Sequence, residues 1–181
     1  MKILFFSDLH GQIDQLQTLL KKQDAMSADW ILNCGDFFGG YSPQEAITQE
    51  LSRLYLSNPA QKLSVLGNND SSTLLSLISN QPYAQSIVQT IGDIHITMTH
   101  GHLGSAEMFL GEQPKTPWRL FIEGHTHVAR LKKVGTSLYL NPGSLSYPRS
   151  QLPPTYAILK EKTLSVKALE NDRVFHSEIL D

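Results

Sequence analysis

Five short apolar segments of this chain are each followed at once by a glycine-containing loop that carries carboxylate, amide or imidazole groups. The segments span residues 3–6, 30–32, 63–66, 94–98 and 120–122. The polar groups that follow them are Asp8 and His10, then Asp36, then Asn68, Asn69 and Asp70, then His100 and His102, and finally His125 and His127. Ligands of open α/β sheets collect outside the carboxyl ends of the strands. We therefore expect the five loops to meet at one site.

The order of the elements predicts a mixed α/β fold. In the first half, apolar segments alternate with stretches whose apolar residues recur at helical spacing, as in residues 13–20. A second helix is expected to begin at the Ser-Pro-Gln-Glu capping box of residues 42–45. In the second half, residues 128–134 and 137–140 flank Gly-Thr and predict a hairpin. We expect a single domain, residues 1–181, that contains two packed sheets.

The composition excludes several classes of protein. The chain has 181 residues, enough for one buried core, and its 15 basic and 17 acidic residues give a net charge of −2. That balance argues against a partner made of long nucleic acid, which usually requires a basic excess. The single cysteine, Cys34, excludes an intramolecular disulfide. No apolar run approaches the ~20 residues that cross a membrane, and the apolar start is too short for a signal peptide. We expect a cytoplasmic protein.

The chemistry of the five loops points to metal binding. Five of the seven histidines lie in these loops, together with aspartate and asparagine but without a thiolate ligand. Such a donor set suits Mn²⁺, Fe²⁺, Ni²⁺ or Zn²⁺. A single tetrahedral ion cannot use seven donors, so we predict a pair of ions about 3.5–4 Å apart. Each motif taken singly is also ordinary turn chemistry. Their joint occurrence after five strands favours the metal interpretation.

In this order the motifs resemble those of the calcineurin-like metallophosphoesterase superfamily. The superfamily is marked by Asp-x-His, then Gly-Asp, then Gly-Asn followed by His or Cys, then His, then Gly-His-x-His. The small size and the Asn-Pro-Gly-Ser sequence at 141–144 resemble its small bacterial and archaeal phosphodiesterase branch, to which the retromer scaffold subunit is also related. The resemblance covers nearly the whole chain.

The resemblance implies a four-layer α/β sandwich, in which two mixed β-sheets are flanked by helices and the metals lie at one edge. It also implies a full ligand set. One ion would be held by Asp8, His10 and His127, the other by Asn68, His100 and His125, and both by Asp36. A hydroxide bridging two divalent ions, with Mn²⁺ expected first and Ni²⁺, Fe²⁺ or Zn²⁺ as alternatives, would attack the phosphorus of a small phosphodiester.

One position departs from the family pattern. The residue after Asn68 is usually histidine or cysteine, which can serve the leaving oxygen, whereas here it is Asn69. An amide cannot act as a general acid near neutral pH. Asp70 remains from that motif. We expect His102 or a metal-bound water to supply the proton, unless the enzyme prefers good leaving groups.

Rival functions follow from the same residues. The leading hypothesis is a metal-dependent phosphodiesterase, and the alternatives are a phosphomonoesterase on the same site or a weakly active or non-catalytic binding scaffold. A competent ligand stands at every expected position, which favours an enzyme. The 141–144 sequence is interpreted as a structural turn rather than a phosphate contact, and Arg149 as a surface residue. The sequence leaves the oligomeric state open, and a homo-oligomer is one option.

Overall fold

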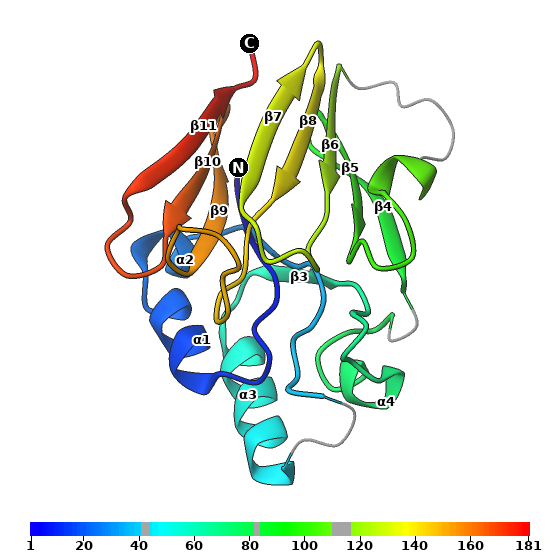
Figure 1. Ribbon diagram of the computed structural model, residues 1–181, viewed down its shortest axis with the longest axis vertical. Helices are drawn as coiled ribbons and strands as arrows, with labels where there is room; N and C mark the ends of the chain where they lie inside the picture. Colours follow the sequence, from blue (N-terminus) through cyan, green and yellow to red (C-terminus); the bar gives the residue numbers. More distant parts are fainter. Residues whose placement is uncertain (41–43, 82–83, 110–116) are drawn as a thin grey trace.

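The computed structural model describes residues 1–40, 44–81, 84–109 and 117–181, and it arranges them as two mixed β-sheets packed face to face (Figure 1). The two mixed sheets predicted from the sequence are confirmed. Helices lie mainly against one of them. The chain alternates strands and helices in its first half and is nearly all strand in its second.

The first sheet has six strands in the order β11-β10-β9-β1-β2-β3. They are β1 (Lys2–Phe6), β2 (Trp30–Asn33), β3 (Gln61–Ser64), β9 (Thr155–Lys160), β10 (Thr163–Ala168) and β11 (Val174–Ile179). The first three run parallel, and β9 pairs with β1 in the antiparallel direction. The predicted segment 63–66 was placed two residues too late. By Leu66 the chain has left this sheet, because the Leu66 N–H donates to the carbonyl of Ala84 near the second sheet.

The second sheet has five strands in the order β4-β5-β6-β8-β7. They are β4 (Ser86–Ile91), β5 (Ile94–Thr99), β6 (Trp118–Ile122), β7 (Arg130–Val134) and β8 (Ser137–Asn141). β5, β6 and β8 run parallel, whereas β4 and β7 are antiparallel edge strands. The predicted hairpin around Gly135 and Thr136 is confirmed as β7–β8.

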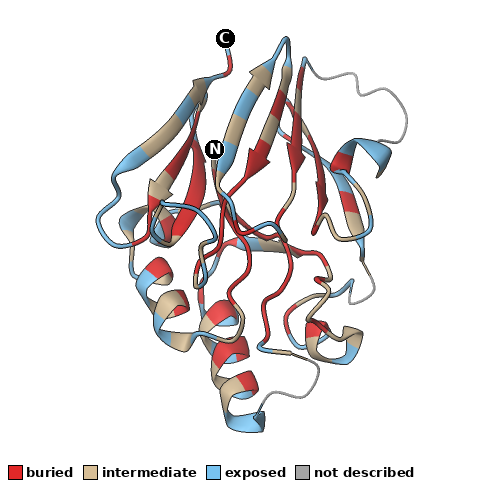
Figure 2. Ribbon diagram, viewed as in Figure 1, coloured by how far each residue is buried: buried red, intermediate tan, exposed pale blue. Residues whose placement is uncertain are grey.

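Each sheet contributes to a buried layer because its strands alternate their side chains between two faces. In β1, Ile3 and Phe5 belong to the core between the sheets, whereas Leu4 and Phe6 belong to the core beneath the helices. A strand buried on both faces needs a continuous apolar run, which is what residues 3–6 supply. Figure 2 shows the buried positions gathered on the strands and on the inner sides of the helices.

The helical layers are unequal. α1 (Ile13–Leu20), α2 (Gln23–Met26) and α3 (Glu45–Ser57) cover the six-stranded sheet, and α4 (Ser72–Leu75) follows β3. Over the five-stranded sheet, the described residues place a single 3-10 helix, η1 (Ala106–Phe109), against β4, β5 and β6. Within the described ranges, no helix has the length and hydropathy needed to span a membrane.

The predicted capping box at 42–45 falls partly outside the described residues, which omit Ser42 and Pro43. The helix that this capping box predicts is present as α3. Gln44 stands at the N-cap position, and its side chain makes no capping hydrogen bond.

Candidate metal centre

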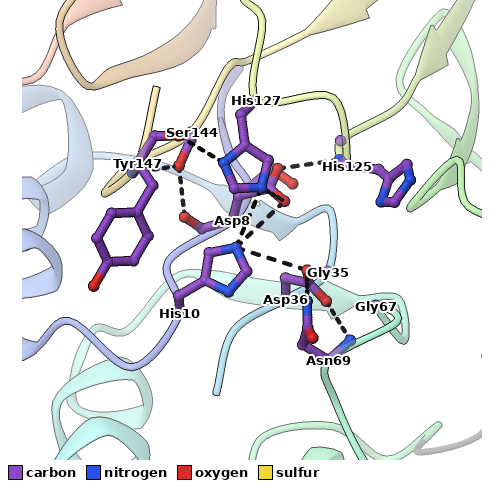
Figure 3. Close-up of polar contacts among 12 residues, drawn as sticks. Asp8, His10, Gly35, Asp36, Gly67, Asn69, His125, His127, Ser144 and Tyr147 are labelled. Carbon is purple, nitrogen blue, oxygen red and sulfur yellow. Dashed lines mark hydrogen bonds and ion pairs between the residues drawn. The ribbon is translucent and has the colours of Figure 1, made fainter. Parts of the chain in front are cut away.

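The loops after β1, β2, β3 and β6 meet at one edge of the two sheets (Figure 3), and the loop after β5 joins them through His100. The Asp8 N–H donates to the Gly35 carbonyl at 3.0 Å within the first sheet, and the Gly124 N–H donates to the His100 carbonyl at 3.1 Å within the second. The His125 N–H crosses between the sheets and donates to Asp8 Oδ2 at 3.1 Å. The structure therefore brings together loops that are more than a hundred residues apart in sequence.

The backbone is strained at the residues expected to bind metal. Among the described residues, seven other than glycine adopt a positive φ, and five of them are expected ligands: Asp8 (54°), His10 (49°), Asp36 (53°), His125 (63°) and His127 (60°). This left-handed conformation costs about 1–2 kcal/mol for a residue with a Cβ atom. Strain of this kind persists where the surrounding fold imposes it, and it gathers at functional sites.

Three donors form one group, and their atoms lie within 4.8 Å of one another: Asp8, His10 and His127. His127 Nε2 lies 3.1 Å from Asp8 Oδ1 and 3.3 Å from His10 Nε2. The opposite nitrogen of His127, Nδ1, donates to the Tyr147 carbonyl at 2.6 Å. A carbonyl can only accept, so Nδ1 carries a proton, and Nε2, which faces Asp8, is the nitrogen that can bind a metal ion when the ring is neutral.

A second group forms around Asn68. The Asn68 Oδ1 lies 3.2 Å from His100 Nε2 and 2.8 Å from His125 Nδ1. His100 is fully buried, and its Nδ1 donates to the Cys34 carbonyl at 2.8 Å. Because Nδ1 carries a proton, Nε2 is the nitrogen that can bind a metal ion when the ring is neutral. This nitrogen faces the amide oxygen of Asn68. Both His100 and His127 thus present the tautomer that a metal ligand requires.

Asp36 lies between the two groups. Its Oδ2 is 3.4 Å from His100 Nε2 in the second group and 3.7 Å from His10 Nε2 in the first. Burial raises the pKa of Asp36, but the hydrogen bond and charge of His100 and two hydrogen bonds from Asn69 outweigh it, and the pKa falls below its usual value. The carboxylate is therefore ionised and placed to serve both groups.

The arrangement is suited to cations. Asp8 and Asp36 are buried, and Asp8 Oδ1 accepts no hydrogen bond from any of the described residues. Ionised buried carboxylates need a compensating positive charge. His10 Nε2 and His127 Nε2 lie only 3.3 Å apart, and a proton or a cation between them would stabilise this approach. The donor set fits divalent metal ions.

The two neighbours of Asn68 contact the donors in different ways. The Asn69 N–H and Nδ2 donate to the two oxygens of Asp36, at 2.8 and 2.7 Å. Asp70 is 3% exposed and accepts the N–H groups of Phe37, Phe38 and Gly67. Burial raises the pKa of Asp70 to about 6. Asp70 therefore ties together the loops after β2 and β3, and Asn69 orients Asp36.

His102 lies beside the second group. Its ring centroid is 5.4 Å from that of His100 and 6.2 Å from that of His125. Its Nδ1 is buried and has no hydrogen-bond partner among the described residues. Burial, reinforced by the nearby charges of His100 and His125, lowers the pKa of His102. The ring is therefore mostly neutral near pH 7.

Supporting residues hold the loops in place: two lie in the 141–144 sequence, which was predicted to be a structural turn, and one, Tyr147, was not singled out. Tyr147 provides the carbonyl that orients His127, and its ring lies 5.7 Å from that of His10. Ser144 donates to the Asp8 carbonyl at 2.9 Å and accepts the Tyr147 N–H at 2.8 Å. Asn141 donates to the Gly124 carbonyl. The 141–144 turn thus anchors two ligand loops, and only its proline-glycine pattern was visible in the sequence.

Metal affinity should fall at acidic pH. The contact with Asp8 raises the pKa of His127, and Asp36 and Asp8 outweigh burial to raise that of His100. A raised pKa means that each imidazole keeps its proton to a higher pH, whereas a metal ligand must be neutral. Affinity should be full above the raised pKa values and fall on the order of tenfold per pH unit for each histidine below them. Calorimetric titration of Mn²⁺ between pH 8 and pH 5.5 measures this slope, and a flat profile would contradict it.

Two packed mixed sheets with a cluster of candidate metal ligands at their edge are the fold of the metallophosphoesterases. A family model, the calcineurin-like phosphoesterase superfamily domain, matches residues 1–164. The chain belongs to the calcineurin-like phosphoesterase superfamily. Membership implies divalent metal ions at the site.

Individual relatives agree with this assignment. Phosphodiesterase YfcE of Escherichia coli K12 is 28% identical over 187 residues, which cover 96% of this chain and 95% of that protein. The probable metallophosphoesterase YsnB of Bacillus subtilis is 29% identical over 178 residues, which cover 95% of this chain and 86% of that protein. The solved structure of YfcE aligns over the whole of both chains with a TM-score of 0.81 at 24% identity. Vps29 of Entamoeba histolytica in complex with zinc shares the fold, with a TM-score of 0.60 at 22% identity over both full chains.

Proposed function

We propose that this chain is a metal-dependent phosphodiesterase that acts on small phosphodiesters. The observation that carries the proposal is the cluster of seven donors, in which His100 and His127 are held in the ligating tautomer by backbone carbonyls. The similarity to YfcE, which is named a phosphodiesterase, supports the diester as substrate. The net charge of −2 argues for a small substrate rather than a long nucleic acid.

Seven side chains would hold two divalent metal ions. Asp8, His10 and His127 would hold one ion, Asn68, His100 and His125 the other, and Asp36 would serve both. Mn²⁺ is the first candidate, with Ni²⁺, Fe²⁺ and Zn²⁺ as alternatives. Such ions polarise a phosphoryl oxygen and lower the pKa of water.

The neighbouring residues determine how protons can move. Asn69 keeps Asp36 oriented by two hydrogen bonds but has no acidic proton to give. The Asp70 carboxyl group is engaged by hydrogen bonds from three backbone amides. His102 is near the cluster but has a lowered pKa, which leaves little of its protonated form at pH 7. Together these contacts favour substrates whose leaving group needs no proton.

The proposed function is tested by hydrolysis of bis-p-nitrophenyl phosphate and of p-nitrophenyl phosphate with Mn²⁺, Ni²⁺, Zn²⁺ or Mg²⁺. We expect metal-dependent turnover with the diester preferred. Preference for the monoester would instead identify a phosphomonoesterase on the same site. If neither ester turns over with any metal and the protein retains none, the binding-scaffold alternative replaces the enzyme.

The role of Asn69 gives a separate prediction. In the Asn69→His variant, turnover should become less dependent on leaving-group pKa, because the imidazole can donate the proton that an amide cannot. Esters of poor leaving groups should gain about 10²-fold or more in rate relative to the wild type, within the range of general acid catalysis. The measurement is the slope of log kcat against leaving-group pKa for a series of aryl diesters.

The matched control is Asn69→Ala, which also removes the side-chain bond to Asp36 but adds no acid. It should lower kcat for all esters and leave the slope steep. A slope that is flat and equal in the wild type and in Asn69→His would contradict the argument.

A further inference from the structure

A cavity of about 320 Å³ lies on the five-stranded sheet directly beside the loop that carries His125 and His127. This volume is at the small end of the range for ligand pockets, about 300–1,000 Å³, so it suits one ring system rather than a polymer. Three other cavities, of 450, 260 and 310 Å³, are lined by residues remote from the five ligand loops.

The cavity wall is aromatic and faces away from the core. Phe121 on β6 and Tyr139 on β8 stand opposite one another in the parallel ladder, and their rings stack at 5.2 Å between centroids with 20° between planes. Their neighbours along each strand, such as Leu120 and Leu138, point the other way into the core between the sheets. Phe121 is only 4% exposed and packs behind Tyr139, so the half-buried ring of Tyr139 supplies most of the aromatic surface that another planar ring could contact.

The cavity shares a loop with the metal centre. Thr126 lines the cavity, and it lies between His125 and His127, whose rings belong to the two donor groups. The Thr126 side chain is fixed by Asn141 Nδ2 at 3.0 Å and by the Val128 N–H at 3.3 Å. One residue of backbone therefore separates the wall of the cavity from each metal-binding histidine.

Hydrogen bonds to η1 hold the wall in place. Tyr139 Oη donates to Glu107 Oε1 at 2.6 Å, and Glu123 Oε1 accepts the Ala106 N–H at 2.7 Å. Arg130, an exposed residue, also lines the cavity. The cavity thus offers a rigid apolar surface, with a cation and a carboxylate at its margin for polar ring substituents.

We propose that this cavity binds a planar aromatic group attached to the phosphate of the substrate. The inference rests on the proposed function, since it takes the phosphate to lie at the metal centre. The phosphate would be held at the cluster while the ring lies across Thr126 against Phe121 and Tyr139. Aromatic phosphoesters are then the substrate class that the site selects over esters of small aliphatic alcohols.

The test compares phenylphosphonate with ethylphosphonate, whose P–C bonds cannot be hydrolysed, by calorimetric titration into the protein in excess Mn²⁺. We expect phenylphosphonate to bind about tenfold more tightly, the gain that a stacked and buried ring supplies. In Val128→Phe, whose new ring would fill the cavity, the preference should fall to about twofold or less. The matched control is Val134→Phe, at an exposed valine on β7 outside the cavity, which should keep the full preference.

Equal affinities in the wild type, no measurable binding of either phosphonate, or a preference that persists in Val128→Phe would overturn the inference. Hydrolysis of aryl diesters is measured on the same preparations. A preference for phenylphosphonate without hydrolysis of aryl diesters would contradict the proposed function alone. Hydrolysis of aryl diesters without that preference would contradict the cavity assignment alone.

Discussion

Replacement of Asp36 by asparagine should lower kcat/KM for a diester on the order of a thousandfold and release at least one equivalent of metal. The carboxylate lies within 3.7 Å of a histidine from each donor group, so its charge supports both. Charge stabilisation by a metal site is worth several kcal/mol in the transition state, and about 1.4 kcal/mol corresponds to tenfold. The new amide would also place its NH₂ group opposite either the Asn69 N–H or Asn69 Nδ2. Both of these groups donate hydrogen bonds, so one of the two bonds to residue 36 would be lost.

The measurement combines steady-state kinetics with metal content after gel filtration. Asp14→Asn is the matched control, because this exposed residue of α1 undergoes the same change of charge away from the site. The control should retain full metal content and activity. An Asp36→Asn protein that keeps two equivalents of metal and most of its activity would rule out a shared carboxylate.

Addition of a single methyl group at Gly67 should nearly abolish activity as well. A Cβ atom built on Gly67 would lie 2.1 Å from Asp36 Oδ1 and 2.2 Å from the Asp36 backbone nitrogen. The backbone nitrogen cannot rotate away, so the loops after β2 and β3 must separate. Overpacking of this kind costs about 1–3 kcal/mol. A displacement of about 1 Å at a catalytic group can cost on the order of a hundredfold in rate.

Gly67→Ala should therefore lower both the free energy of unfolding in urea and, by about a hundredfold or more, kcat/KM. Gly135→Ala is the control, since its Cβ would meet no atom within 4 Å while its φ of +59° still strains alanine. That variant should lose about 1–2 kcal/mol of stability and no activity. Equal activity in the two variants would show that the loops accommodate the added methyl group without displacing Asp36, and would contradict the steric argument.

Much of the candidate site could be predicted because its donors follow strand ends directly in sequence. Asp8 and Asp36 come after continuous apolar runs, which are typical of strands buried on both faces and form β1 and β2. Parallel neighbours end at the same edge. The loops contain five histidines and no cysteine among the expected ligands, and this set of ligands indicates borderline divalent ions such as Mn²⁺ or Zn²⁺.

Other features depend on contacts that no local pattern encodes. Asn69 was expected to matter through the acid that it lacks, yet the structure shows that it donates to both oxygens of Asp36. Tyr147 has no signal of its own in the sequence, because it acts through a backbone carbonyl. The positive φ at five expected ligands was equally invisible, since aspartate and histidine are common in turns of every kind.

The sequence by itself determined which segments become strands, which residues stand at their ends and which ions those residues suit, because periodicity and side-chain chemistry are local properties. Only the tertiary structure decided which donors face one another. His10 and His127 approach to 3.3 Å because two separate sheets pack with their carboxyl edges together. That distance depends on the burial and packing of two cores, which involve residues from nearly the whole chain.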